Sequence, residues 1–400
     1  MDAEYQKRLL DVYRDGLLND TLPFWFPRCV DEDHGGFLLA RDRDGSLLDD
    51  DKGMWQQCRA TWILATLYNT VEPNNSWLEW ANCGLRFIDR HGRDSDGRMW
   101  FHVTRDGRPL RKRRYVFTEC FGAIAYASLA KATDNAALAD TSRDLFSLAK
   151  RHFSDPSLVE SKFTDTRPVK SIGTPMIQIA TAQELRLNLG DESFTTDIDS
   201  AIEEIRRDFM KPEVECVMET VAQDGSIIDH FEGRMLNPGH AIECAWFILW
   251  EARFRGNDPE LIRTGCQILD WMWARGWDEK FGGLLYFRDI NGKPVQEYWH
   301  DMKFWWPHNE ALIACLLAWL LTEEQKYADW HKKAHDWAYG HFADPEYGEW
   351  FGYLHRDGSV SVPLKGNLWK GPFHLPRMQL VCWKLLAESI EKKTRSNSCD

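Results

Sequence analysis

Residues 302–321 have the sequence MKFWWPHNEALIACLLAWLL, and this stretch decides the fold class. Its later part, residues 311–321, contains no polar side chain. A helix that is apolar around its whole circumference is buried on every side. Its first part, in contrast, is crowded with polar and aromatic groups such as Trp306, His308 and Glu310. The stretch therefore predicts an inner helix of a large helical protein, with functional side chains at its N-terminal end.

The same design recurs along the chain. Strongly apolar segments start roughly sixty to seventy residues apart, near Gly53, Tyr115, Thr174, Asn237, Met302 and Gly371. A more amphipathic segment follows each of them, as in residues 327–338, where apolar side chains fall on one helical face. Together with a first helix over residues 4–27, the pattern predicts twelve helices in six pairs. That arrangement is an (α/α)6 barrel of six inner and six outer helices.

Short sequence motifs that begin and end with Asp or Gly lie between the predicted helices. They alternate apolar and polar residues and end in Asp-Gly, which is typical of a β-hairpin. Clear copies occupy residues 33–45, 96–107, 278–289 and 344–358, and a weaker copy occupies residues 223–225. We expect short hairpins in the loops on one rim of the barrel.

The sequence favours one domain. No linker rich in Pro, Ser or Gly interrupts the helical repeats, so residues 1–390 are predicted to form a single catalytic domain. Residues 391–400 are polar and are predicted to form a frayed C-terminal tail.

Composition limits the function classes. A net charge of −13 disfavours nucleic acid as a partner, because its phosphates would be repelled. The basic run of residues 111–114 is the exception, and it is either a solvated loop or an anion or nucleotide contact. No apolar run reaches membrane-spanning length. The ten cysteines include no CxxC pair, which favours reduced core thiols in a cytoplasmic protein.

The starts of the predicted inner helices carry polar and aromatic groups. If all six helices run in one direction, these groups converge on one rim, where helix N-termini also favour a developing negative charge. The groups are Trp55 and Arg59; Tyr115, Phe117 and Glu119; Asn237, His240 and Glu243; Lys303, Trp306 and Glu310; and His374 and Arg377. The pairs His240/Glu243 and His374/Arg377 have i, i+3 spacing, so each pair shares a helix face.

Two histidines beside arginines and glutamates indicate proton transfer next to a carbonyl group. Histidine titrates near neutral pH and serves as a base or an acid. An arginine can stabilise an enolate oxygen, and one such donor is typically worth about 3 kcal/mol. A single buried histidine is more often a packing residue, but that interpretation weakens when His240 and His374 occupy matching helix starts.

Other patterns are less specific. His331 and His335 have the i, i+4 spacing of metal ligands, but two lysines between them on an outer helix disfavour a metal. The acidic run of residues 49–51 is interpreted as a solvated loop, and no P-loop motif is present. Glu243 and Glu310 could form the carboxylate pair of a glycosidase, so that class stays open.

Several motifs in the same order resemble the N-acylglucosamine 2-epimerase family, also called renin-binding proteins, over residues 5–386. The motifs are residues 31–37, 105–109, Asn237-Pro238-Gly239-His240 with Glu243, Lys303-x-Trp305-Trp306-Pro307-His308 with Glu310, residues 344–353, and Phe373-His374-x-Pro376-Arg377. The resemblance implies an (α/α)6 barrel, a homodimer, and interconversion of N-acetylglucosamine with N-acetylmannosamine. It also implies ATP or another nucleotide as an activator that is not consumed, with no redox cofactor and no metal.

The family's functional residues correspond to Arg59, His240, Glu310, His374 and Arg377. The other helix-start residues that we expect to bind substrate are Glu243, Trp306, Lys303, Tyr115 and Asn237. Similar cellobiose 2-epimerases and aldose–ketose isomerases carry a third histidine early in inner helix six, whereas residues 174–177 of this chain are Thr-Pro-Met-Ile. This difference favours the N-acyl-sugar branch.

The expected mechanism opens the sugar ring, removes the C2 proton with one histidine and returns a proton to the opposite face with the other. Arg59 or Arg377 would hold the enolate oxygen, while Glu310 would either orient a base or bind substrate. The alternatives are an aldose–ketose isomerase, a 2-epimerase acting on an unsubstituted sugar such as mannose or cellobiose, a glycosidase, and a binding protein without enzymatic activity.

Overall fold

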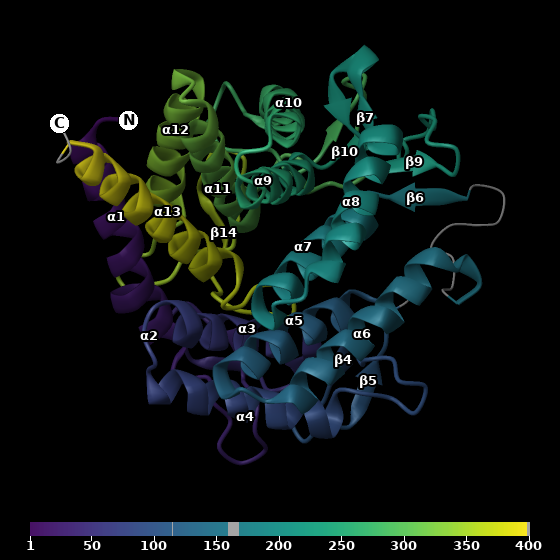
Figure 1. Cartoon of the computed structure of the whole chain (residues 1–400), viewed down its shortest axis with the longest axis vertical. Coiled ribbons are helices and arrows are strands. Elements are labelled where there is room, and N and C mark those ends of the chain that lie inside the picture. The colour runs from purple at the N-terminus through teal and green to yellow at the C-terminus, as the bar shows by residue number, and fades with distance from the viewer. Residues whose placement is uncertain (114, 159–167, 398–400) are drawn as a thin grey trace. The chain divides into compact units, whose positions relative to one another are not determined.

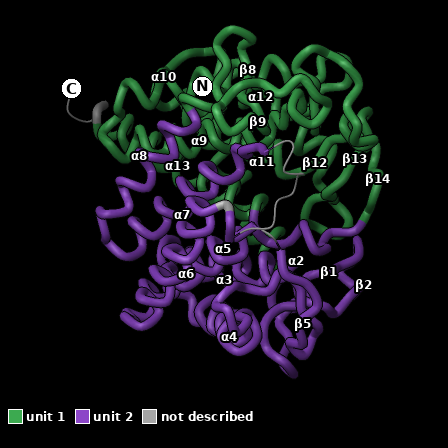
Figure 2. The backbone as a smooth tube through the Cα atoms, turned by 90° about the vertical axis from the view of Figure 1, so that its right-hand side faces the viewer, with its two compact units in different colours: residues 1–24, 206–363, 374–400 green, residues 25–205, 364–373 purple. Residues whose placement is uncertain are grey.

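The computed structural model describes residues 1–113, 115–158 and 168–397 (Figure 1). The chain forms two compact units, which Figure 2 distinguishes by colour. Unit 1 contains residues 1–24, 206–363 and 374–400, and unit 2 contains residues 25–205 and 364–373. Because the chain passes from one unit to the other several times, the division does not test the predicted single domain, which stays a prediction.

Unit 2 consists of three helical pairs. In each pair a deeply buried helix packs on an amphipathic one, and the three buried helices α3, α5 and α7 also pack in a row. The pairs are α3 (Met54–Thr70) with α4 (Asn75–His91), α5 (Phe117–Thr133) with α6 (Ala136–Ser154), and α7 (Gly173–Leu189) with α8 (Thr195–Glu204).

Unit 1 repeats the arrangement with α9, α11 and α13 as the row of inner helices. Its pairs are α9 (Pro238–Phe254) with α10 (Pro259–Gly276), α11 (Trp305–Thr322) with α12 (Gln325–His341), and α13 (His374–Asn397) with α1 (Ala3–Asp15). The last pair brings the N-terminal helix against the C-terminal one, as Figure 1 shows. All six predicted inner helices are therefore confirmed, each starting within a few residues of its predicted position.

The remaining helical segments are short. The predicted first helix over residues 4–27 is divided into α1, a π-helical segment (Gly16–Thr21) and α2 (Leu22–Trp25). A second π-helical segment is Ile205–Phe209, and the 3-10 segments are Pro156–Leu158, Glu192–Phe194 and Pro212–Val214. The last helix extends to Asn397, past residue 391, where the sequence predicted a frayed tail.

Short strands lie between the helices, as the Asp-Gly motifs predicted. In unit 2 they are β1 (Ala40–Arg41), β2 (Leu47–Asp49), β3 (Lys52–Gly53), β4 (His102–Val103), β5 (Pro109–Arg111) and β6 (Val169–Ser171). In unit 1 they are β7 (Met210–Lys211), β8 (Cys216–Val217), β9 (Thr220–Ala222), β10 (Met235–Leu236), β11 (Arg288–Asp289), β12 (Lys303–Phe304), β13 (Tyr353–Leu354) and β14 (Val360–Val362). The antiparallel pairings are β1–β2, β3–β4–β5, β7–β8, β10–β11 and β12–β13–β14.

Helix α11 has the burial that its composition predicts. Every residue from Trp305 to Trp319 is buried, so the helix has no exposed stripe along that length. It ends where Glu323 adopts a left-handed conformation with φ of 59°, which stops further helical hydrogen bonding. Outer helix α12, in contrast, buries one face through Tyr327, Ala334 and Trp337.

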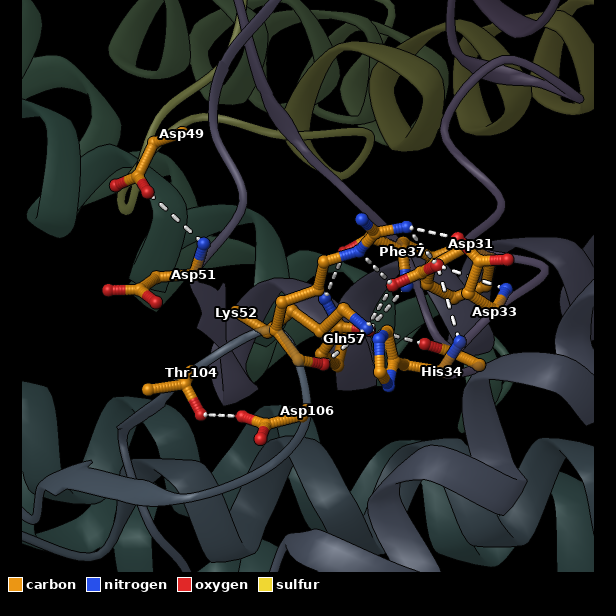
Figure 3. Close-up of polar contacts among 12 residues, drawn as sticks. Asp31, Asp33, His34, Phe37, Asp49, Asp51, Lys52, Gln57, Thr104 and Asp106 are labelled. Carbon is orange, nitrogen blue, oxygen red and sulfur yellow. Dashed lines mark hydrogen bonds and ion pairs between the residues drawn. The ribbon is translucent and has the colours of Figure 1, made fainter.

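Each unit holds one copy of a buried lysine–aspartate joint before an inner helix. In unit 2, Lys52 Nζ donates to Asp31 Oδ2 at 2.7 Å and to the carbonyl oxygen of Gly35 at 2.6 Å (Figure 3). In unit 1, Lys303 Nζ donates to Asp278 Oδ2 at 3.1 Å and to the carbonyl oxygen of Gly283 at 3.2 Å. We call these two arrangements the Lys–Asp joints.

The two Lys–Asp joints also share a third side chain, which lies five positions after the lysine in each unit. Gln57 Oε1 accepts a hydrogen bond from the backbone N–H of Phe37 at 2.8 Å (Figure 3). His308 Nε2 accepts the equivalent bond from the N–H of Leu284 at 2.8 Å, and its Nδ1 donates to the Phe304 carbonyl oxygen at 2.7 Å. Each side chain thereby ties the hairpin preceding the joint to the following inner helix, so His308 has a structural role.

Among residues 1–113, 115–158 and 168–397, none of the helices combines the length and apolar character that crossing a bilayer requires. The described cysteines are free thiols, and most of them are buried, as predicted.

Candidate functional site

The start of α9 positions His240. Asn237 is the N-cap residue, and its Oδ1 accepts a hydrogen bond from the backbone N–H of His240 at 3.2 Å. Pro238 follows at the first helical position, where its missing N–H and fixed φ favour a helix start. The Asn237 side-chain nitrogen also lies 3.1 Å from His240 Nδ1. Asn237, predicted to bind substrate, is 2% exposed and holds the histidine in place.

Glu219 faces His240 from the loop between β8 and β9. Both of its carboxylate oxygens lie 3.1 Å from His240 Nδ1. Burial lowers the pKa of His240, but the charge and hydrogen bond of Glu219, with the more distant charges of Glu243 and Glu310, outweigh this effect and raise it above its ordinary value. The His240 side chain stays 32% exposed.

His374, the first residue of α13, makes a comparable pair with Glu310 of α11. Its Nδ1 lies 2.7 Å from Glu310 Oε1. The second oxygen, Oε2, accepts a hydrogen bond from Trp246 Nε1 at 2.6 Å. Glu310 is fully buried, so these contacts fix both of its oxygens. An ionised carboxylate at this distance requires the proton on Nδ1 of the imidazole, which leaves Nε2 of His374 as the basic nitrogen.

Arg377 neutralises the carboxylates of this cluster. Its Nη2 atom donates to Glu243 Oε1 and to Glu310 Oε1, each at 2.6 Å, and lies 3.3 Å from His374 Nδ1. The guanidinium is 8% exposed, so the two ion pairs are largely shielded from water. Burial acts against its charge, but the two carboxylates outweigh that effect and raise the pKa of Arg377.

Trp306 packs beside both His240 and His374. Its ring centroid lies 5.0 Å from that of His240 and 5.8 Å from that of His374. Both imidazoles therefore border the same indole, although 134 residues separate them in sequence. We define the His–Glu cluster as Glu219, His240, Glu243, Trp246, Trp306, Glu310, His374 and Arg377, all in unit 1.

Lys303, another predicted substrate-binding residue, lies outside this cluster. Its ammonium is fully buried in the Lys–Asp joint with Asp278, which also accepts from Arg356 Nε at 2.8 Å. Burial lowers the pKa of Lys303 to about 8, although Asp278 opposes that shift. A lysine enclosed in this way supports the start of α11, and its predicted contact with substrate stays a prediction.

Arg59 and Tyr115 belong to unit 2. The Arg59 guanidinium carbon lies 4.1 Å from the ring centroid of Phe121 and 4.4 Å from that of Phe373. Tyr115 packs on Phe117, with ring centroids 4.9 Å apart. Their predicted catalytic and substrate-binding roles stay predictions.

The basic run has structural contacts of its own. Lys112 pairs with Asp94 and Asp96, and Arg111 and Arg113 lie over the ring of Phe101. The fourth member, Arg114, lies outside the described residues. The sequence left a solvated loop or an anion contact open, and these contacts favour the first.

Within the part of the chain that the structure describes, possible metal ligands occur in two places. Ligand atoms of Glu243, Glu310 and His374 lie within 4.8 Å of one another. Arg377 already supplies a cation to this group, so we give a metal no role there. The second group is the acidic run of residues 49–51, which is exposed to partly exposed, as predicted for a solvated loop.

The histidines of α12 form a different structure. Tyr13 Oη lies 3.1 Å from His331 Nε2 and 3.0 Å from His335 Nδ1, and burial lowers the pKa values of these histidines to about 3 and about 4. They therefore join α12 to α1.

The sequence missed two members of the His–Glu cluster, Glu219 and Trp246. Glu219 is the only charged residue in the mostly apolar run Cys-Val-Met-Glu-Thr-Val at residues 216–221, and a charge within such a run was the available signal. Trp246 carried no signal, because a tryptophan in an all-apolar helix is usually a packing residue.

Comparison with known proteins identifies relatives across almost the whole chain. The sequence model of the family described as N-acylglucosamine 2-epimerase (GlcNAc 2-epimerase) matches residues 35–374. N-acylglucosamine 2-epimerase of Mus musculus is 31% identical over 406 residues, which cover 97% of this chain and 95% of the mouse protein. The Bos taurus N-acylglucosamine 2-epimerase is 32% identical over 405 residues, covering 97% and 94%.

A solved structure has the same fold. Cellobiose 2-epimerase from Bacillus thermoamylovorans superposes with a TM-score of 0.82 at 21% identity, covering 94% of this chain and 99% of that protein. Together with the six helical pairs, this likeness confirms the predicted (α/α)6 barrel class.

Proposed function

Because the chain belongs to the N-acylglucosamine 2-epimerase family, we propose that it interconverts N-acetyl-D-glucosamine and N-acetyl-D-mannosamine. The reaction inverts C2 of the ring-opened sugar by removing and returning a proton. The supporting observation is the pair of imidazoles, His240 and His374, that border the same indole while each is held through Nδ1 by a carboxylate.

The proton transfers are proposed to use the Nε2 atoms, because Nδ1 of each histidine lies against a carboxylate. The aldehyde of the open chain acidifies the C2–H bond, so a neutral imidazole can remove the proton and leave an enolate. Inversion requires delivery of a proton to the opposite face of C2, and a second imidazole on a different helix can supply it. His240 on α9 and His374 on α13 are the candidates, because each contacts its carboxylate through Nδ1 and both border Trp306.

Glu310 is proposed to orient the base. Its two oxygens are already engaged by His374, Arg377 and Trp246, so it has little capacity left for a sugar hydroxyl. A carboxylate in this position holds the imidazole in the tautomer that exposes Nε2, as the aspartate of a serine-protease triad does. Arg377 keeps Glu310 ionised and lies beside the reacting region. Arg59 is carried over from the family resemblance as a second candidate for holding the enolate oxygen.

Several further properties are proposed from the resemblance alone. These are a homodimer, a cytoplasmic location, and ATP or a similar nucleotide as an activator that is not consumed.

The decisive experiment incubates the purified chain with N-acetylmannosamine, with and without ATP, in deuterated water. We expect N-acetylglucosamine carrying deuterium at C2, because both bases exchange protons with solvent. Parallel incubations contain free mannose or cellobiose. Formation of fructose from mannose, with no reaction of the N-acetyl sugar, would replace the proposal with an aldose–ketose isomerase. Epimerisation of cellobiose alone would instead indicate a 2-epimerase of unsubstituted sugars.

A further inference from the structure

The two histidine–carboxylate pairs of the His–Glu cluster are not equivalent. Glu310 shares its charge among three donors: His374, Arg377 and Trp246. Glu219 hydrogen-bonds to His240 alone among the described residues. One carboxylate is thus paired with a guanidinium, whereas the other contacts only an imidazole.

The neighbours of each imidazole reinforce this difference. His374 Nδ1 lies 3.3 Å from the guanidinium nitrogen of Arg377, and a cation at that distance disfavours a second positive charge. The largest charge effects on His240 come from the carboxylates of Glu219, Glu243 and Glu310, of which the last two also pair with Arg377. All three favour the imidazolium form, and Glu219 is in direct contact.

From this geometry we propose that Glu219 is a positioning residue that holds His240 as the protonated partner of the pair, so that His240 is the resting acid and His374 the resting base. This inference rests on the proposed function. Glu219 acts through His240, and no contact of Glu219 with substrate is required.

The proton balance of one turnover follows from this assignment. His374 Nε2 takes the C2 proton, and the electrons of the C2–H bond pass into the enolate. His240 Nε2–H then donates its proton to the opposite face of C2, which leaves His240 neutral and His374 charged. Exchange of protons with solvent restores the resting state. The epimer whose C2–H bond faces His374 is therefore the one that the resting enzyme converts directly.

The test compares pH profiles of kcat for the wild-type enzyme, Glu219→Gln and the control Glu213→Gln. Glu213 is exposed and lies six residues earlier, so its variant removes the same charge from the same region. Loss of the Glu219 charge should lower kcat about a hundredfold, the range for a misplaced acid or base. The alkaline limb, which reports loss of the donor's proton, should move to lower pH by about one unit. The acidic limb should stay in place, and Glu213→Gln should match the wild type.

Two results would overturn the inference: a Glu219→Gln profile that superimposes on the wild-type one, or a shift of the acidic limb in place of the alkaline limb. If Glu219→Gln does not fold, Glu219→Asp keeps the charge and should retain the wild-type alkaline limb at reduced kcat. A moved limb in that variant would count against the proposal.

Nuclear magnetic resonance of the histidine rings in the wild-type protein provides a readout independent of turnover. The His240 signals are assigned by their loss in His240→Gln. We expect His240 to titrate above the ordinary range for histidine, and a lower value would refute the proposal. If the wild-type chain did not act on N-acetyl sugars, the proposed function would fail, while this titration would still decide whether Glu219 controls His240.

Discussion

The Nδ1 atom of His374 lies 2.7 Å from Oε1 of Glu310, which comes from a different helix. Because Glu310 is fully buried and is also bound by Trp246, its orientation is fixed before any sugar enters. The contact also fixes the orientation of the His374 ring, so that Nε2, the proposed base, needs no reorganisation. In the proposed mechanism, preorganisation of this kind would lower the barrier of proton transfer.

Glu310→Gln is expected to lower kcat by about a hundredfold or more while leaving KM within a few-fold. The amide keeps the shape of the side chain, but it lacks the charge that fixes the tautomer of His374. Steady-state kinetics in both directions provide the measurement, and Glu324→Gln on an exposed position is the matched control. A large rise in KM with unchanged kcat would assign Glu310 to substrate binding instead.

The single variants His240→Ala and His374→Ala are each expected to abolish epimerisation but to retain exchange at C2 of one epimer. Each remaining imidazole can still remove and return a proton on its own face. In deuterated water the two variants should therefore label opposite epimers, as measured by mass spectrometry. Epimerisation by either variant would exclude the missing histidine from the mechanism, and circular dichroism controls for folding.

Arg377→Met is expected to lower the free energy of unfolding by about 3 kcal/mol, because it leaves two carboxylates, Glu243 and Glu310, without their buried cation. Adding Glu243→Gln should recover part of this loss, since one uncompensated charge is removed. Urea denaturation of the single and double variants measures both effects. Equal stability of wild type and Arg377→Met would show that the ion pairs contribute little.

Lys303→Met is expected to destabilise unit 1 by about 3 kcal/mol with little change in KM, because Lys303 serves the Lys–Asp joint. Lys52→Met makes the corresponding change in unit 2 and should have a comparable effect on stability. Chemical denaturation and substrate titration are compared for the two variants. If Lys303 bound the sugar, only Lys303→Met would raise KM strongly.

Stability is expected to fall as the pH drops from about 6.5 towards 4, partly because of His308. Burial lowers the pKa of His308 to about 3, so the folded protein keeps it neutral while the unfolded chain takes up a proton near pH 6.5. Each such histidine lowers the free energy of unfolding by about 1.4 kcal/mol for every unit that the pH falls within this window. His331 and His335 act in the same direction.

His308→Gln should fold, because Gln57 makes the equivalent hydrogen bond in unit 2. The variant should also lose less stability in acid, because its unfolding takes up about one proton fewer than unfolding of the wild type. Urea denaturation at pH 7, 6 and 5 measures the slope. An unchanged slope would show that His308 already titrates normally in the folded protein, contrary to its buried position.

The sequence predicted the helical framework well because burial on every side leaves a clear mark. The apolar run of α11 and its five counterparts gave the number, order and approximate starts of the inner helices. Their starts also contained most members of the His–Glu cluster. The division of residues 4–27 by a π-helical segment (Gly16–Thr21) was not predicted, because the apolar spacing that indicates this helix runs from Leu9 to Leu17 alone, most of which precedes the segment.

The partners of individual side chains could not be predicted, because they come from distant parts of the chain. His308 and His374 lie on neighbouring inner helices and both looked functional in sequence, yet one binds backbone atoms and the other a buried carboxylate. The pairing of Lys303 with Asp278 could not be predicted for the same reason, because Asp278 lies 25 positions earlier in the chain. Glu219 was overlooked because it precedes a strand and does not begin a helix.

The Lys–Asp joints occur once in each unit, whereas the two histidine–carboxylate pairs belong to unit 1 alone among the described residues. The Lys–Asp joints that support the inner helices are thus separate from the proposed catalytic pairs. Over evolutionary time, mutations at the starts of the inner helices could change the sugar that is accepted, while the Lys–Asp joints stay unchanged.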